Sequence, residues 1–248
     1  MNFEICAVNL QSALAAQSAG AQRIELCSAL DVGGLTPSLG LIRASVRALD
    51  IPVHVLIRPR EGDFCYSDQE LEIMLEDIQL CLEAGAAGVV VGALTIEGHL
   101  DLPKMKAMKV AAGTMEITCH RAFDFTQSPT DALEQLVDLG YGRVLSSGQS
   151  DNAFEGRFLL QKLILQAKNR IAVMPGAGIN AQNIGAIAAV TGANDYHFTG
   201  KTKVTTPAKN DIPGLDSWHW ESDIQTIKEI ISAASEFIHH SSYIIHHT

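Results

Sequence analysis

Residues 51–91 read IPVHVLIRPREGDFCYSDQELEIMLEDIQLCLEAGAAGVVV and contain one complete strand–helix–strand unit. The pattern predicts an apolar strand over Val53–Ile57, a long helix over about Asp68–Ala84, and a second apolar strand over Gly88–Val91. Strands that flank a helix in this way pair in parallel, because a parallel connection must cross over the sheet. The unit therefore predicts an α/β fold with a parallel sheet.

The same alternation extends to both ends of the chain. Further strands are predicted over Phe3–Val8, Arg23–Cys27, Glu116–His120, Arg143–Leu145, Ile171–Met174 and Asp195–Phe198. Eight such units close a barrel, and the 248 residues match the length of about 250 that is usual for this fold. We therefore expect a single-domain TIM (β/α)8 barrel over residues 1–240 and a short C-terminal tail over residues 241–248.

The remaining features agree with a barrel. An open doubly wound sheet is the alternative, but no GxGxxG follows the first strand and no linker divides the chain into halves. The segment Gly200–Trp220 is expected to be a long loop, followed by an amphipathic helix over about Ser222–His239. The tail carries His246 and His247, which we expect to face solvent or a partner.

Composition narrows the class of partner. The formal net charge of −10 argues against nucleic-acid binding and favours a protein that handles small molecules. The first residues, MNFEICAVNL, lack the features of a signal peptide, and no apolar run approaches the about 18 residues of a membrane span. These features predict a cytoplasmic protein without a membrane partner. The five cysteines are expected to be reduced thiols, because their odd number and the chain length do not suit a disulfide framework.

Strand parity sorts side chains between the two faces of the barrel wall. Alternate residues point to opposite faces, so the apolar set of each strand should face the helices and the polar set should point inward. Inward residues early in their strands are expected to form a closed polar network: Glu4, Arg23, His54, Glu116 and Asp195. Residues at or beyond the strand ends are candidates for function, because barrel enzymes carry their active sites there. These are Cys6, Cys27, Arg58, Arg60, His120, Arg121, Asp124, Ser147 and His197.

Several of these residues lie in distinctive motifs. The motifs are ELC at 25–27, GGLTPS at 33–38, IRPREGDFCYSDQE at 57–70, CHRAFD at 119–124, VLSSGQ at 144–149 and PGAGI at 175–179. Together they resemble the CutC family, from about residue 4 to at least residue 200. The resemblance implies a cytoplasmic α/β barrel, a homo-oligomer for which we favour a dimer, and a role in copper homeostasis.

The first functional hypothesis is binding of monovalent copper, which prefers soft thiolate ligands. Cys6 and Cys27 share inward parity on neighbouring strands about 4.8 Å apart, so both sulfurs could reach one ion. The resemblance implies that this pair is the copper site, with Met174 or His120 as a possible third ligand. Spacing alone leaves open two inert buried thiols, because the pair forms no CxxC motif. Cys65 lies on a loop and could supply another thiol.

The alternative is a barrel enzyme that acts on a small phosphorylated or carboxylated substrate by general acid/base chemistry. Glu25 and His120 would be its base and acid, with Asp124 orienting them and Arg58 clamping the substrate. The anion-binding candidates are Arg60, Ser147, Gly176, Gly178 and Lys201, and Asn180 could cap the helix that follows PGAGI. A copper protein should tolerate Arg58→Ala, and an enzyme should tolerate Cys6→Ser. A scaffold that acts through its oligomer surfaces should tolerate both.

Overall fold

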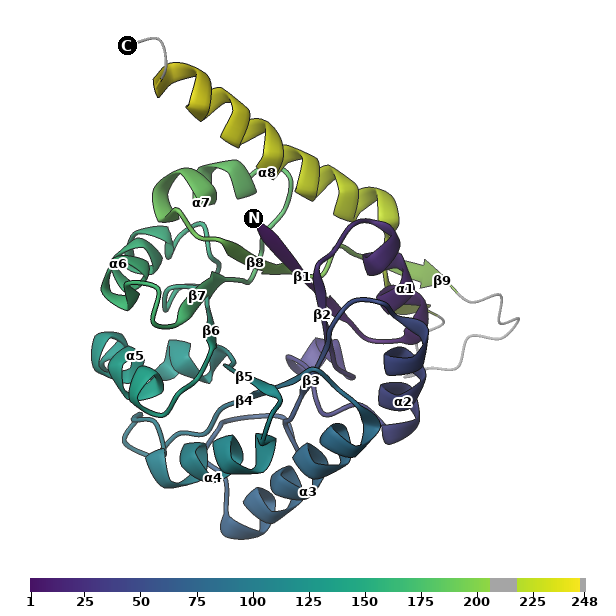
Figure 1. Cartoon of the computed structure of the whole chain (residues 1–248), viewed down its shortest axis with the longest axis vertical. Helices are drawn as coiled ribbons and strands as arrows, with labels where there is room; N and C mark the ends of the chain where they lie inside the picture. The colour runs from purple at the N-terminus through teal and green to yellow at the C-terminus, as the bar shows by residue number, and fades with distance from the viewer. Residues whose placement is uncertain (206–217, 246–248) are drawn as a thin grey trace.

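The computed structural model describes residues 1–205 and 218–245, with side-chain surroundings up to residue 236. Eight parallel strands form a nearly closed ring, surrounded by helices (Figure 1). The strands are β1 (Asn2–Ala7), β2 (Arg23–Leu26), β3 (Val53–Leu56), β4 (Gly88–Val91), β5 (Glu116–Cys119), β6 (Arg143–Ser146), β7 (Ala172–Pro175) and β8 (Asp195–Phe198). The predicted (β/α)8 barrel is confirmed.

Seven parallel pairings join the strands in the order β7-β6-β5-β4-β3-β2-β1-β8. In the β1–β2 pair, Cys6 lies opposite Glu25, and in the β1–β8 pair, Glu4 lies opposite His197. The ring is completed between β7 and β8 by an isolated bridge from Gly176 to His197. This junction, which we call the seam, is the least extensively paired part of the barrel wall.

The helices that follow the strands begin and end at residues suited to those places. They are α1 (Leu10–Ser18), α2 (Leu39–Ala48), α3 (Asp68–Ala84), α4 (Leu102–Ala112), α5 (Pro129–Asp138), α6 (Arg157–Ala167), α7 (Ile184–Thr191) and α8 (Ile224–Ile245). Helix α3 shows why the boundaries fall where they do. Ser67 and Glu70 form a reciprocal capping box at its start, and Gly85 takes the left-handed conformation at its end.

The apolar core lies between the strands and the helices. Ile5, Ile24, Val55 and Val89 are fully buried there, on the strand face that parity assigns to the helices. Inside the barrel, a second apolar cluster contains Cys6, Cys27, Leu56 and Val90. Cys81 and Cys119 lie in the apolar core between the strands and the helices.

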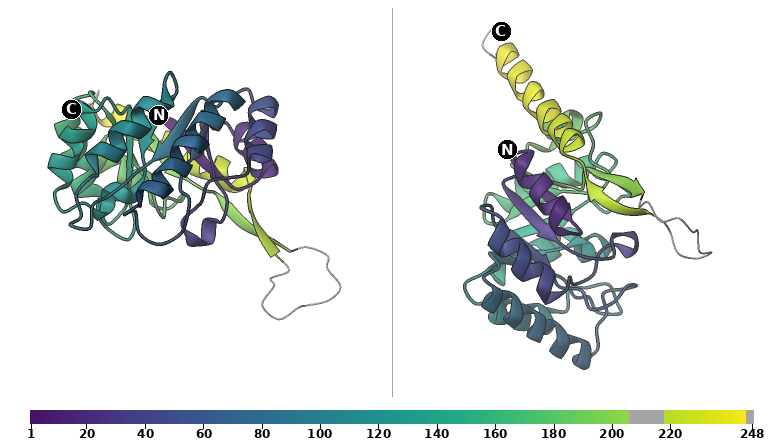
Figure 2. Two further views of the ribbon diagram at one scale, coloured as in Figure 1. Left: turned by 90° about the horizontal axis from the view of Figure 1, so that it is seen from below. Right: turned by 90° about the vertical axis from the view of Figure 1, so that its right-hand side faces the viewer.

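The prediction of a loop over Gly200–Trp220 is wrong at both of its ends. Strands β9 (Lys201–Thr205) and β10 (Trp218–Ser222) pair as an antiparallel hairpin that projects from the barrel (Figure 2). The Lys201 Nζ lies 4.0 Å from the ring centroid of Trp220, and the Lys203 Nζ lies 3.8 Å from that of Trp218. These cation–π contacts join opposite strands of the hairpin.

Hydrogen bonds tie the hairpin to the barrel, from Ser222 N to Ser12 Oγ (3.0 Å), from Trp220 Nε1 to Asp31 Oδ1 (2.7 Å) and from Asn9 Nδ2 to Trp220 O (3.3 Å). Helix α8 continues to Ile245, beyond the expected end near His239. The middle of the predicted loop and the tail histidines His246 and His247 lie outside the described residues. Within the described part of the chain, none of the helices combines the length and apolarity that a membrane crossing requires.

The expected polar network occupies the end of the barrel where the strands begin. Glu4 accepts hydrogen bonds from Arg23 Nε and, at 2.8 Å, from His197 Nδ1. Asp195 Oδ1 lies 3.5 Å from Arg23 Nη2, and His54 Nε2 lies 3.6 Å from Glu116 Oε2. The network also includes Arg143, whose Nη1 lies 3.4 Å from Glu116 Oε2. The buried charges of Glu4, Arg23 and Asp195 are paired with one another, as buried ionic groups must be.

Candidate functional site

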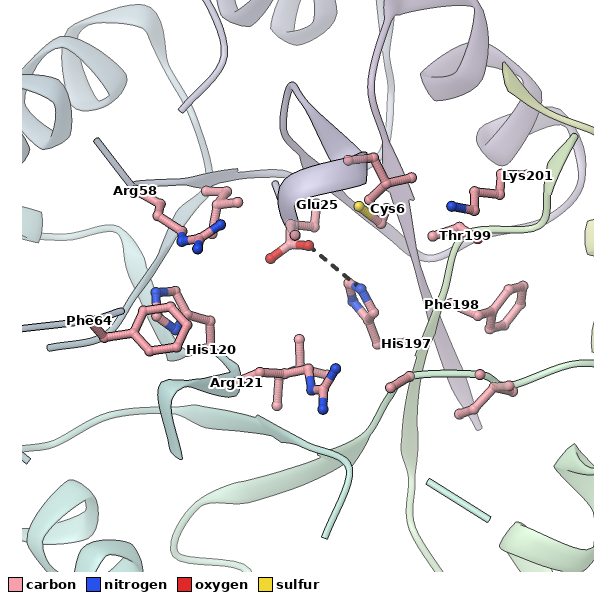
Figure 3. Close-up of a pocket in the computed structure, with 17 residues that line it drawn as sticks. Cys6, Glu25, Arg58, Phe64, His120, Arg121, His197, Phe198, Thr199 and Lys201 are labelled. Carbon is pink, nitrogen blue, oxygen red and sulfur yellow. Dashed lines mark ion pairs between the residues drawn. The ribbon is translucent and has the colours of Figure 1, made fainter. Parts of the chain in front are cut away.

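A pocket of about 440 Å³ opens at the ends of the barrel strands, where active sites of this fold lie. Figure 3 shows Arg58, Phe64 and His120 toward its left, and Glu25, Cys6 and His197 nearer its centre. Cys6, Glu25 and His197, from β1, β2 and β8, form what we call the thiol wall. Arg58, Phe64 and His120, from the segments after β3 and β5, form the basic wall. The pocket therefore presents different chemistry on its two sides.

The thiol wall contains two cysteines in contact. The Sγ atoms of Cys6 and Cys27 are 3.4 Å apart, and both residues are buried. Cys6 lines the pocket, whereas Cys27 lies behind it. The hydrogen bond with Cys27, together with burial, raises the pKa of the Cys6 thiol well above its usual value. This thiol is therefore protonated at neutral pH until a metal displaces its proton.

Glu25 and His197 extend this cluster. One ligand atom each from Cys6, Glu25 and His197 lies within 4.8 Å of the other two. His197 Nε2 is 3.6 Å from Glu25 Oε2, while its Nδ1 is hydrogen-bonded to Glu4. Burial raises the pKa of Glu25. Burial alone would lower the pKa of His197, but the carboxylates of Glu25 and Glu4 raise it. An imidazole oriented by a carboxylate in this way is a common metal ligand.

Arg58 provides the positive charge of the basic wall. Its guanidinium donates to three backbone carbonyls: Val32 O (2.7 Å), Gly34 O (2.8 Å) and Gly62 O (2.9 Å). No carboxylate of the described residues lies within ion-pair distance of it. The guanidinium also packs on Phe64, at 5.2 Å from the ring centroid. Arg58 is thus a buried cation that neutral groups hold in place.

His120 lies beside Arg58 on the same aromatic ring, at 4.9 Å between ring centroids. Its Nδ1 accepts a hydrogen bond from the backbone N–H of Ala122 at 3.1 Å. Burial and the charge of Arg58 lower the pKa of His120 to about 3. The imidazole is therefore neutral, and its proton is on Nε2, because Nδ1 acts as the acceptor. Nε2 is buried and has no partner among the described residues.

Acid should destabilise the protein through His120. The folded state holds this group neutral down to about pH 3, whereas the unfolded chain protonates it near 6.5. The unfolded state therefore binds more protons between these values, and the free energy of unfolding falls as the pH is lowered. Through His120 alone, the free energy of unfolding should fall by about 2 kcal/mol between pH 6.5 and pH 5.

Urea unfolding at several pH values will measure this effect. His120→Leu should make the dependence of unfolding free energy on pH shallower in this range by that amount. Equal slopes for His120→Leu and the unchanged protein would contradict a neutral buried His120.

Four of the residues selected from the sequence do not line the pocket, and each is hydrogen-bonded to neighbouring groups instead. Arg60 donates to Asp63, Glu70 and the carbonyl of Cys65, and so organises its own loop. Asp124 accepts from Ser146 Oγ at 2.6 Å and from Ser147 N at 3.1 Å, which fixes the loop after β6. The Ser147 hydroxyl is likewise bonded to Asp124 and to the carbonyl of Ser150. Gly176 is part of the barrel wall, because its N–H donates to Ser146 O.

Gly178 and Lys201 do line the pocket, together with Arg121, whose Nη2 donates to Ser147 Oγ at 3.0 Å. Asn180 does not cap α7, because Asn183 occupies that position and the Asn180 side chain accepts from Gln182 N. Met174 lies in the polar network, where Arg23 Nη2 is 3.6 Å from its sulfur. Cys65 is half-buried on its loop, outside the pocket lining.

Sequence reasoning did not foresee that Glu25 and His197 would join Cys6 as possible metal ligands. The signal was present, because all three residues have inward parity on three strands that are adjacent once the barrel closes. His197 was selected only as a residue at a strand end. The pairing of β8 with β1 brings it beside Cys6.

Comparison with known proteins identifies the family. The model of the CutC family matches residues 1–202. A CutC family protein of Pasteurella multocida is 43% identical over 244 residues, which cover 96% of this chain and 100% of that protein. A relative in Parabacteroides distasonis is 46% identical over 229 residues, covering 91% and 94% of the two chains.

Comparison with solved structures supports the same family. A CutC protein of Streptococcus agalactiae, assigned by name to copper homeostasis, superposes with a TM-score of 0.77 at 36% identity, covering 80% of this chain and 98% of that one. Phosphoribosylanthranilate isomerase of Thermotoga maritima has a TM-score of 0.58 at 14% identity, covering 95% and 99%, and shares the barrel fold alone. The sequence motifs, the barrel and the matches over most of the chain establish that this protein belongs to the CutC family.

Proposed function

We propose that this protein takes part in copper homeostasis by binding one monovalent copper ion between Cys6 and Cys27. The observation that carries the proposal is the 3.4 Å separation of the two sulfurs, of which that of Cys6 belongs to a residue that lines the pocket. Monovalent copper selects soft thiolates over the oxygen ligands that hard cations prefer. The name of the Streptococcus agalactiae relative, which refers to copper homeostasis, supports the same function.

His197 completes the donor set better than the ligands suggested by the sequence. Its Nε2 faces the Cys6–Glu25 side of the pocket, and Glu4 holds the opposite nitrogen. Met174 belongs to the polar network, and the free nitrogen of His120 carries a proton. Two thiolates and one imidazole suit a soft ion, and the Glu25 carboxylate would balance charge beside it.

Titration with monovalent copper in the absence of oxygen, against a chromogenic competing chelator, tests the proposal. The unchanged protein should bind one equivalent, and Cys6→Ser and Cys27→Ser should each lower the affinity by about 100-fold or more, beyond the range for lost outer-sphere contacts. Cys65→Ser is the matched control, because this thiol lies on a loop outside the pocket lining. Unchanged affinity in Cys6→Ser would overturn the proposal. The cytoplasmic location and the dimer remain predictions.

A further inference from the structure

The basic wall contains a hydrogen-bond donor with nothing to donate to. His120 is only 5% exposed, and its Nε2–H has no acceptor among the described residues. A buried donor left unsatisfied destabilises the folded protein, and such groups in native proteins have a reason to be there. Because His120 lines the pocket, a ligand atom in the pocket can be its acceptor. That atom must carry a lone pair.

Arg58 adds a charge that calls for the same kind of ligand. The three carbonyls around it satisfy N–H groups but carry no formal negative charge. Its Nε has no partner among the described residues. Glu25 is the carboxylate that lines the pocket, and it lies on the thiol wall beside His197. A buried cation without a counter-ion favours binding of an anion.

The surroundings hold these two groups side by side. Phe64 contacts both the guanidinium and the imidazole, so both groups share one apolar support. Gly92 leaves space for the imidazole, because a Cβ at that position would lie 2.6 Å from His120 Cε1. A donor and a cation fixed in a partly dehydrated pocket interact more strongly with an anion than they would in water.

We propose that His120 and Arg58 bind the carboxylate group of a small organic acid on the basic wall. A carboxylate has one negative charge and two acceptor oxygens, which match one buried cation and two free donors, His120 Nε2–H and Arg58 Nε–H. A phosphate would bring a second charge and a third oxygen that this pair does not satisfy. The site goes beyond copper binding, because it lies on the wall opposite the thiols and uses other residues.

Acetate is the probe that tests the carboxylate alone. In an NMR titration at pH 7.5 and constant ionic strength, acetate should shift the His120 Nε2–H resonance in a saturable way. His120→Leu and Arg58→Met should each weaken binding by about 10-fold or more, followed through the amide resonances of the pocket loops. Arg170→Met is the matched control, because it removes an exposed arginine that is paired with Glu134.

The outcomes separate the possibilities. Absence of saturable acetate binding, or binding that His120→Leu leaves unchanged, would overturn the proposal. Tighter binding of inorganic phosphate than of acetate would overturn the choice of a carboxylate. Arg58 also holds two loops, so a failure of Arg58→Met to fold leaves His120→Leu as the decisive variant. Cys6→Ser should retain acetate binding, so the result is independent of the copper experiment.

Discussion

Replacing Glu4 by leucine is expected to lower the free energy of unfolding by about 3–5 kcal/mol, the cost of breaking a buried ion pair from one side. Glu4 is 1% exposed and is bound by both Arg23 and His197. The hydrogen bond from His197 and the charge of Arg23 outweigh burial and hold the pKa of Glu4 well below its usual range. Without this carboxylate, Asp195 at 3.5 Å is the one ion-pair partner that the described residues leave to the guanidinium of Arg23.

Urea unfolding at pH 7 measures the effect. The double variant Glu4→Leu/Arg23→Met should recover much of the loss, because it removes both charges together. Glu134→Leu breaks the exposed pair with Arg170 and should cost far less than Glu4→Leu, because solvent screens that pair. Additive losses in the double variant would show that the two groups do not depend on each other. Glu4→Leu also releases His197 Nδ1, so it should weaken copper binding by about 10–100-fold.

Replacing Gly156 by alanine is expected to cost more than about 3 kcal/mol, because the new methyl group would overlap the backbone. A Cβ at this position would lie 1.9 Å from Ser147 O and 2.8 Å from Gly148 Cα. Neither neighbour is the end of a flexible side chain. The loop after β6 would have to move, although Asp124 holds it through Ser146 and Ser147.

Gly40→Ala is the control for this substitution. Gly40 lies inside α2, and its nearest neighbour to a new Cβ would be Ser38 Oγ at 3.9 Å. Alanine should therefore stabilise the helix there by about 0.5–1 kcal/mol. Thermal or urea unfolding of the two variants should give changes of opposite sign. A loss below 1 kcal/mol for Gly156→Ala would contradict the close approach of the two backbone segments.

Much of the barrel could be predicted because its signals are local. Each strand is a short apolar run followed by a helix, and two-residue periodicity then assigns its faces. The hairpin of β9 and β10 lacks such a signal. Its segments, KTKVT and WHWES, are polar and are separated by a stretch that contains Pro207, Pro213 and Gly214. The lysine–tryptophan contacts that join the strands become visible only when they are paired.

The site residues also differ in how well the sequence could predict their positions. Cys6 and Cys27 could be placed together because Cys6 is on β1 and Cys27 directly follows β2, so that parity and strand neighbours fix their positions. Arg60, Asp124 and Ser147 are on loops, and the hydrogen bonds that keep them out of the pocket lining depend on the loop conformation. The free Nε2 of His120 could not be predicted either. It follows from a loop contact, in which the backbone N–H of Ala122 donates to Nδ1 and leaves the proton on Nε2.

The seam between β7 and β8 lies directly beside the pocket. Elsewhere in the barrel wall, neighbouring strands are joined by a continuous ladder of backbone pairing. At the seam, an isolated bridge between Gly176 and His197 closes the ring. Gly178 and Ala177 lie on one side of this bridge and His197 on the other, and all three line the pocket. Widening the ring at the seam disrupts little pairing, whereas widening it elsewhere would break a whole ladder. The part of the barrel wall that backbone pairing holds least is therefore also part of the wall of the pocket.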